Sequence, residues 1–163
     1  MLDIFQRGSK FTKIKKETAN ELWKLILEER EELHYKNSNS LSWCGINLFP
    51  DKFKECMKKV YEDLGEVNNS YRIIQTKHYE KGAWMDLHKD MREIGDKIAM
   101  ITLGGDKQYN FYDTENKEYQ VLNVSHGDVV ILKGECLKNN IEHGFNPLEN
   151  PCGTIVLRNY RYN

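Results

Sequence analysis

Hydrophobic and polar residues follow different patterns in the two parts of the chain. Before residue 70, apolar residues recur at the three- and four-residue spacing of an amphipathic helix, whereas from Tyr71 onward short β-rich runs alternate with polar turns. The pattern therefore predicts a mainly β protein of the α+β class, in which two N-terminal helices support the sheets.

The first part predicts two helices separated by a polar break. The first helix covers Glu17–Leu33, and its apolar stripe consists of Ala19, Leu22, Trp23, Ile26 and Leu33. The second begins at Pro50 and ends at Gly65, and its apolar stripe consists of Phe53, Met57, Val60, Tyr61 and Leu64. Between them, Lys36–Ser40 breaks the pattern, and Leu41–Leu48 predicts a short strand or a lid hairpin.

The second part predicts eight short strands. They are Tyr71–Tyr79, Trp84–His88, Lys97–Leu103, Gln108–Tyr112, Tyr119–Val124, Asp128–Leu132, Ile141–Phe145 and Thr154–Tyr160. Short strands joined by close turns are typical of a jelly roll or a small barrel. With 163 residues we expect one domain, in which residues 1–70 form the helical support and a short substrate lid and residues 71–163 form the strand core.

Composition and charge narrow the possible function classes. Twenty-four basic and 25 acidic residues give a net charge of -1, so no overall positive field draws the chain to DNA or to an anionic membrane. A small basic cluster of Lys10, Lys13, Lys15 and Lys16 predicts a solvated flank, with an arm that contacts phosphates as the alternative. The cysteines lack C-x-x-C spacing, and no secretory signal or membrane-spanning run is present. We therefore expect a cytoplasmic protein with reduced thiols and no membrane partner, and we assume a monomer.

A His-x-Asp pair makes the segment Tyr79–Asp90 a candidate metal site. Side chains two apart on a strand project to the same face, so His88 and Asp90 can reach one ion. An isolated triplet of this kind is common and favours a surface histidine, but the order of strands and turns around it favours a metal site. Two histidines and one carboxylate leave open positions on a ferrous ion for a cosubstrate and oxygen. His143 is the best candidate for the third ligand.

The last predicted strand carries a candidate anion-binding residue. Val156, Arg158 and Tyr160 share one face of the strand by their alternation. If that face is interior, Arg158 needs an anionic partner, because an unpaired buried charge costs several kcal/mol. A dicarboxylate cosubstrate supplies one, since a guanidinium grips a carboxylate with two parallel hydrogen bonds. The alternative is an ordinary surface arginine.

Taken in chain order, several segments of the sequence resemble those of the AlkB-like iron(II)/2-oxoglutarate-dependent dioxygenases. The similar pieces are Tyr79…Gly82-Ala83…Leu87-His88-x-Asp90, Ile98–Gly104, His126–Leu132, His143-Gly144…Pro147-Leu148 and the Arg158 strand. The resemblance implies a double-stranded β-helix, a jelly roll, in which His88, Asp90 and His143 hold Fe(II) and 2-oxoglutarate chelates the metal.

The resemblance also implies a set of cosubstrate contacts. Arg158 is expected to pair with the far carboxylate of 2-oxoglutarate, with Tyr160 on the same face, and Tyr79 is expected to donate a hydrogen bond to it. Arg161 competes with Arg158, because the family usually has two arginines six apart, whereas these are three apart. Lys77 stands where well-known members carry an amide that touches the cosubstrate.

The resemblance implies that O2 and 2-oxoglutarate are consumed to hydroxylate a C–H bond, with succinate as a product. The implied substrate is a methylated nucleic-acid base, extruded into the pocket and demethylated or hydroxylated. The short region before residue 71 leaves little room for a lid that grips a duplex, so we expect a single strand or a nucleotide. Trp43 either stacks on that base or packs the lid, and Trp84 either lines the pocket or packs the sheet.

Two other functions stay open. The first keeps the oxygenase chemistry and acts on a protein side chain or a small molecule, which the near-neutral charge favours. The second is a non-catalytic jelly-roll binding module. The presence of three candidate metal ligands and a candidate cosubstrate arginine counts against it.

Overall fold

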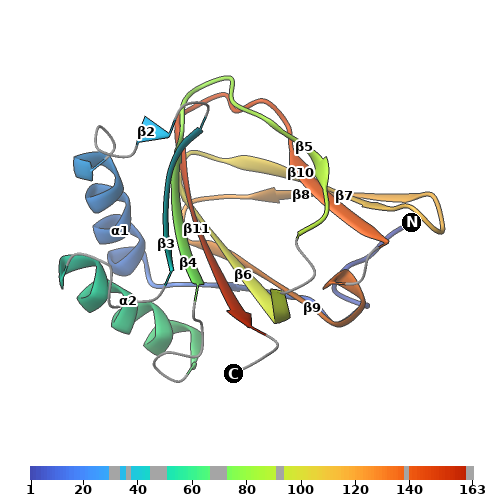
Figure 1. Cartoon of the computed structure of the whole chain (residues 1–163), viewed down its shortest axis with the longest axis horizontal. Helices are drawn as coiled ribbons and strands as arrows, with labels where there is room; N and C mark the ends of the chain where they lie inside the picture. The colour runs from blue at the N-terminus through green and yellow to red at the C-terminus, as the bar shows by residue number, and fades with distance from the viewer. Residues whose placement is uncertain are drawn as a thin grey trace.

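The computed structural model describes residues 1–29, 34–35, 38–44, 51–66, 73–90, 94–137 and 140–160, without the side chains of 29, 34–35, 38–44, 73, 94 and 160. This part of the chain is mainly β with two α-helices, as predicted (Figure 1). In chain order the elements are β1 (Lys10–Lys13), α1 (Lys16–Glu29), β2 (His34–Tyr35), β3 (Ser38–Cys44), α2 (Asp51–Leu64), β4 (Ile73–Tyr79), β5 (Met85–His88), β6 (Ile94–Gly104), β7 (Lys107–Asp113), β8 (Glu118–Val124), β9 (Asp128–Lys133), η2 (Gly134–Leu137), β10 (Ile141–Phe145) and β11 (Cys152–Tyr160).

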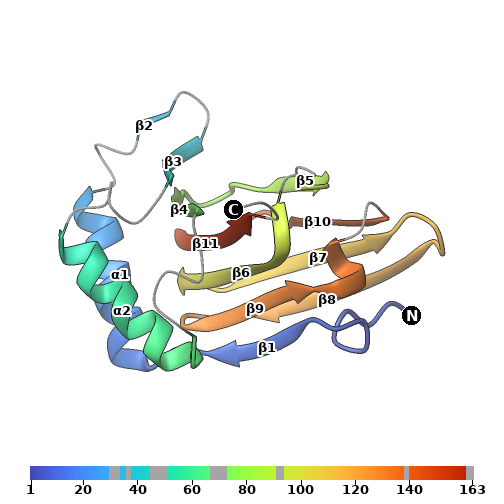
Figure 2. The same cartoon turned by 60° about the horizontal axis from the view of Figure 1, so that its bottom comes forward.

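Two antiparallel sheets build the β part. The larger has the order β1-β9-β6-β11-β4-β3-β2, and the smaller has the order β5-β10-β7-β8. From β4 onward the chain passes back and forth between the sheets, so strands that are neighbours in a sheet are distant in sequence. Figure 2 shows the helices together at one side of the larger sheet.

Each face of the larger sheet covers a separate hydrophobic core. One core lies between this sheet and the two helices and includes Leu22 and Ile26 of α1 with Ile101 and Ile155 of the sheet. The other lies between the two sheets, where residues such as Met100 meet apolar residues of the smaller sheet. Strand β7 alternates strictly between buried and half-buried residues, as expected of a strand with one face on a core.

The strand and helix predictions agree well with the structure. All eight predicted strands are present, with bounds shifted by a few residues. The predicted first helix extends to residue 33, whereas α1 ends at Glu29 and residues 30–33 lie outside the described part. None of the described helices is long and apolar enough to cross a membrane.

The N-terminal segment contains a strand that the sequence analysis did not predict. The lysines of its basic cluster are exposed, as predicted, but residues 10–13 also form β1, whose Lys10 pairs with Ile131 of β9. Leu2 and Ile4, just before this strand, are buried in the core between the sheets. The strand is short and lies at a sheet edge, where exposed lysines are common, so its sequence resembles a flank.

A buried carboxylate fastens this N-terminal segment to the β7–β8 hairpin. The Asp113 side chain has no exposed surface. It accepts hydrogen bonds from the Asn116 side chain at 2.8 Å, from the Arg7 guanidinium at 2.6 Å and from the Glu115 backbone N–H at 2.9 Å. These bonds hold the pKa of Asp113 well below its ordinary value, and the bond from the Asn116 side chain contributes most.

Replacing Asp113 by asparagine is expected to lower the free energy of unfolding near neutral pH by about 2 to 4 kcal/mol, because the charge that Arg7 faces is removed. Since the folded-state pKa is depressed, the stabilisation by Asp113 is complete above about pH 4 and is lost as the pH falls below it. Urea unfolding should therefore show a steeper acid loss for the wild type than for Asp113→Asn. The exposed Asp106 offers the control Asp106→Asn, and parallel acid profiles of Asp113→Asn and the wild type would contradict the prediction.

Candidate active site

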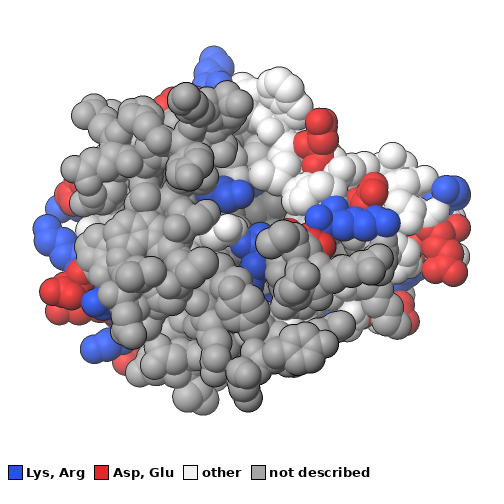
Figure 3. All heavy atoms as spheres, viewed as in Figure 1, with Lys and Arg blue, Asp and Glu red and all other residues white. Residues whose placement is uncertain are grey.

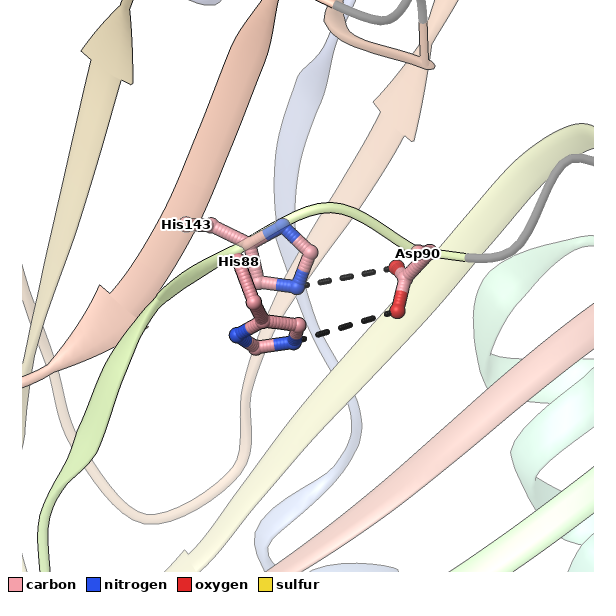
Figure 4. A group of neighbouring side chains, drawn as sticks. All are labelled: His88, Asp90 and His143. Atoms are coloured by element: carbon pink, nitrogen blue, oxygen red, sulfur yellow. Dashed lines mark ion pairs between the residues drawn. The ribbon is translucent and has the colours of Figure 1, made fainter.

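Three side chains from separate segments converge at one end of the smaller sheet. His88 is the last residue of β5, Asp90 follows two residues later, and His143 lies opposite His88 on the neighbouring strand β10. Figure 4 shows both imidazole rings directed toward the Asp90 carboxylate. The predicted strand Trp84–His88 and β5 both end at His88, so Asp90 approaches from the segment that follows the strand and not from the strand itself.

The distances fit a single metal ion. Nε2 of His88 lies 4.0 Å from Oδ1 of Asp90, and Nε2 of His143 lies 3.6 Å from Oδ2. One ligand atom from each residue lies within 4.8 Å of the other two. Ligand bonds of about 2.1 Å separate neighbouring donor atoms by about 3 to 4 Å. The three residues therefore match the two-histidine, one-carboxylate set of non-haem iron sites.

Each histidine has a feature that suits a metal ligand. Nδ1 of His88 lies 2.9 Å from the backbone oxygen of Asp86. A carbonyl oxygen only accepts hydrogen bonds, so Nδ1 carries a proton and Nε2 is the nitrogen that faces Asp90 and can bind a metal ion. Burial is the main cause that lowers the pKa of His143, so its imidazole is neutral near pH 7. A metal ion therefore does not have to displace a proton from the His143 ring.

A glycine next to the third ligand allows the two strands to approach closely. A Cβ atom on Gly144 would lie 2.4 Å from the backbone oxygen of Met85. Any side chain at this position would push β10 away from β5 and separate His143 from His88. The close approach of β10 to β5 therefore requires a glycine immediately after His143.

Arg158 lies beside the three convergent residues. Its Nη2 lies 3.4 Å from Oδ1 of Asp90, and its Nη1 donates a hydrogen bond to Oε1 of Gln75. Its Nε is buried and has no hydrogen-bond partner among the residues that the structure describes. Arg158 thus faces the interior, and the carboxylate that it contacts is the candidate metal ligand Asp90.

A pocket extends from His88, Asp90 and His143 into the space between the sheets. Its other polar lining residues are Lys77, Tyr79, Lys107, Tyr109, Thr154 and Arg158. Within the described part of the chain, Asp90 is the one carboxylate in this lining, against three cationic side chains. The pocket therefore attracts anions.

The most deeply buried of these cations is Lys107, whose residue is 3% exposed. Its Nζ donates a hydrogen bond to Oγ1 of Thr154 and lies 5.0, 5.3 and 4.5 Å from the ring centres of Tyr79, Tyr109 and Phe145. The rings stabilise the charge in part, but no described carboxylate forms an ion pair with it. Burial lowers the pKa of Lys107 to about 8. A buried ammonium group in this setting favours an anionic ligand.

Lys107 and Arg158 mark opposite ends of the pocket. Thr154, the hydrogen-bond partner of Lys107, and Arg158 both lie on β11, four residues apart and on the same face. Four residues of strand span about 13 Å. His88, Asp90 and His143 lie at the Arg158 end of the pocket, so the length of the pocket separates them from the Lys107 ammonium group.

Lys107 was not among the site residues predicted from the sequence. The residue follows the turn at residues 104–106, where a lysine is ordinarily exposed. A signal was nevertheless present, because Lys107 has the same strand parity as Tyr109 and Phe111, and all three face the core.

The other predicted site residues lie at the margin of the described structure or outside it. Trp43 and Tyr160 belong to β3 and β11, but their side chains are not among those described, and Arg161 lies outside the described residues. The register also shifts between Arg158 and Tyr160, so simple alternation does not extend to the end of β11. Trp84 is 64% exposed and does not belong to the pocket lining.

The geometry agrees with a comparison of the chain with protein families. Residues 5–163 match the family model described as the 2OG-Fe(II) oxygenase superfamily. The chain belongs to the 2OG-Fe(II) oxygenase superfamily. A search of curated proteins gives no match. The family covers almost the whole sequence, so the reaction class of this oxygenase does not depend on a short motif.

Membership of this superfamily establishes the chemistry of the chain. It is an Fe(II)/2-oxoglutarate-dependent dioxygenase, with Fe(II), 2-oxoglutarate and O2 as the reacting cofactors, and it carries the His88, Asp90 and His143 group. The predicted enzyme class is confirmed. The superfamily does not distinguish an AlkB-like enzyme from other members.

Proposed function

We propose that His88, Asp90 and His143 hold the Fe(II) of this oxygenase, and that Lys107 and Thr154 bind the far carboxylate of 2-oxoglutarate. The observation that carries this proposal is the buried Lys107 ammonium, which lacks a described carboxylate partner and lies at the opposite end of the pocket from the metal-binding geometry. A dicarboxylate satisfies both ends, because each carboxylate then meets a positive group.

When bound, Fe(II) and 2-oxoglutarate would supply the oxidising chemistry together with O2, of which one oxygen atom enters a C–H bond of the substrate as hydroxyl and the other enters succinate, with release of carbon dioxide. The chain provides the environment. Burial raises the pKa of Tyr79 far above its ordinary value, so its hydroxyl stays protonated and able to donate a hydrogen bond to the cosubstrate. Arg158 orients the Asp90 carboxylate, and apolar walls such as Met100 and Val156 exclude water.

For the far carboxylate we favour Lys107 over the arginines that the sequence indicated. Arg158 already contacts Asp90 and Gln75, close to the metal-binding geometry. Arg161 stays a candidate from the sequence alone. Arg158 then acts as a positioning residue for a metal ligand.

We also infer that strands β4 to β11 form the double-stranded β-helix that the resemblance implies, and that residues 1–163 form one domain. The alternation of these strands between two antiparallel sheets supports the jelly roll. Burial of Leu2 and Ile4 in the core between the sheets supports a single domain, because the N-terminal end packs with the strand core.

For the substrate, the sequence resemblance supports AlkB-like oxidation of a methylated base in a single strand or a nucleotide. On the face seen in Figure 3, the described acidic and basic side chains are interspersed and form no broad basic surface. The near-neutral net charge of the whole chain favours a short or small substrate over a long duplex. The alternative, a protein side chain or a small molecule, is favoured by the cationic pocket lining, because 1-methyladenine and 3-methylcytosine are themselves cations.

The test is anaerobic loading with Fe(II) and 2-oxoglutarate, followed by air and oligonucleotides that carry 1-methyladenine or 3-methylcytosine. Demethylation matched by succinate would establish the base as substrate. Succinate without a change in oligonucleotide mass would direct the search to small molecules and side chains. If the protein binds neither Fe(II) nor 2-oxoglutarate, the proposed ligand set is wrong.

A further inference from the structure

Among the residues that the structure describes, the charges of the pocket do not balance when only the cosubstrate is counted. If Fe(II), Asp90, 2-oxoglutarate and Lys107 are taken together, as the proposed function requires, their formal charges cancel. Two pocket cations, Lys77 and Arg158, are then in excess. Uncompensated charges in a half-buried site cost free energy, so the complete site is expected to receive another anion.

Lys77 is placed to receive it. It lies on β4 with Gln75 and Tyr79 on the same face, so it lies between the Gln75–Arg158 contact at one end and Tyr79, which packs on Lys107, at the other. No described hydrogen bond or ion pair engages its ammonium group. Burial, and after it the positive charges of Arg158 and Lys107, lower the pKa of Lys77, whereas Asp90 raises it. The Lys77 side chain lines the same pocket as these three residues, and its backbone pairs with Thr154 of β11.

Arg158 supplies a second unused donor in the lining of the same pocket. Its Nη1 and Nη2 are engaged by Gln75 and Asp90, but its Nε is buried and has no partner among the described residues. A buried N–H without an acceptor destabilises the site, and one oxyanion can accept from it and from an ammonium group.

We propose that Lys77, together with Nε of Arg158, forms an oxyanion subsite for the substrate, so that this oxygenase acts on a small molecule that carries a carboxylate or a phosphate near the carbon to be oxidised. The proposal rests on the proposed function, because Lys107 and the metal must account for the two carboxylates of 2-oxoglutarate. It also separates the site from one built for a cationic methylated base, which would meet two positive charges here.

The test measures anion binding to the full chain loaded with 2-oxoglutarate and Mn(II), a metal that keeps the coordination but does not start turnover. Inorganic phosphate and acetate are titrated separately by calorimetry. We expect Lys77→Met to weaken the binding of at least one of them by roughly 10- to 100-fold, as for the loss of a charge-assisted hydrogen bond. Lys77→Arg should recover most of the affinity. Lys81→Met, in the exposed turn after β4, is the matched control and should bind as the wild type.

The outcomes separate the two proposals. If the loaded protein binds 2-oxoglutarate but neither anion depends on Lys77, the oxyanion subsite is wrong and the proposed function stands. If Lys77→Met weakens 2-oxoglutarate as strongly as Lys107→Met does, Lys77 binds the cosubstrate instead, and the subsite is again wrong. If the wild type fails to bind 2-oxoglutarate, the proposed function fails and the subsite falls with it.

A turnover assay distinguishes the source of the oxyanion. Succinate formation is measured with a panel of small carboxylic acids, with nucleoside monophosphates and with the nucleoside 1-methyladenosine, which carries no phosphate. Stimulation by an acid or a monophosphate that is lost in Lys77→Met identifies a carboxylate or a phosphate, respectively. Stimulation by 1-methyladenosine that is unchanged in Lys77→Met would overturn the subsite.

Discussion

Replacing His143 by alanine is expected to weaken divalent metal binding by at least roughly 100-fold and to abolish succinate formation. The estimate follows from the cost of losing an outer contact to a metal ligand, about 10- to 100-fold, which the loss of the ligand itself should exceed. Equilibrium dialysis of Fe(II) under anaerobic conditions, or of Mn(II), measures the affinity directly. The histidine is buried, so thermal unfolding must show that the variant is folded at the temperature of the assay.

The matched control for this prediction is His126→Ala. His126 lies away from the pocket, where its Nδ1 accepts a hydrogen bond from the Gly104 N–H at 2.9 Å and its Nε2 contacts Asn20 at 2.8 Å. Its removal should cost some stability and leave metal affinity unchanged. Equal metal affinity in His143→Ala and the wild type would show that the ion binds elsewhere, and would remove the basis for His88 and Asp90 as ligands as well.

The fold was largely predictable because polar turns separate the short β-rich segments in the second part of the chain. Strand β7 alternates between buried and half-buried residues after a turn with two glycines, and β9 is an apolar run between Gly127 and Gly134, so the length and position of both strands are visible in the sequence. The order of strands in the sheets was not visible, since it depends on contacts between distant residues. Strand β1 was missed for a related reason: its pairing with β9 is specified by β9, and its own sequence is mostly polar.

The candidate metal site was predictable in part. The His88-x-Asp90 spacing is a local feature, and the pairing of β5 with β10 then brings His143 opposite His88. The contact partner of a long charged side chain could not be predicted in the same way. Arg158 was expected to face inward and does so, but its contact with Asp90 depends on where the segment after β5 runs.

The anion-binding end of the pocket could not be predicted from local sequence. Lys107 lies next to Thr154 only because β7 and β11, in different sheets, face each other across the core. A lysine after a glycine turn is in most proteins a surface residue. Burial among three aromatic rings is a property of the tertiary structure, so only the structure identifies this ammonium group as a candidate ligand for the cosubstrate.

Replacing Lys107 by methionine is expected to raise the Kd for 2-oxoglutarate by roughly 100-fold or more. Removal of one member of a buried charge pair costs about 2 to 5 kcal/mol, and methionine preserves most of the apolar volume of the lysine stem. Calorimetric titration of the Mn(II)-loaded protein measures this Kd. Metal affinity without 2-oxoglutarate should be unchanged, since Lys107 lies at the end of the pocket away from Asp90. The control Lys81→Met should bind 2-oxoglutarate as the wild type does.

The pH dependence of 2-oxoglutarate binding makes the role of Lys107 more specific. Its pKa is lowered by burial to about 8 in the free protein, and only the protonated form can pair with a carboxylate. Wild-type affinity should therefore be complete below about pH 8 and should fall as the pH rises through it, by up to about tenfold per pH unit. In Lys107→Met the affinity should be low and nearly constant over the same range. A wild-type profile that does not fall above pH 8, or a Lys107→Met profile that falls in parallel with it, would assign the far carboxylate to a group with a higher pKa, such as one of the two arginines that the sequence indicates, Arg158 and Arg161.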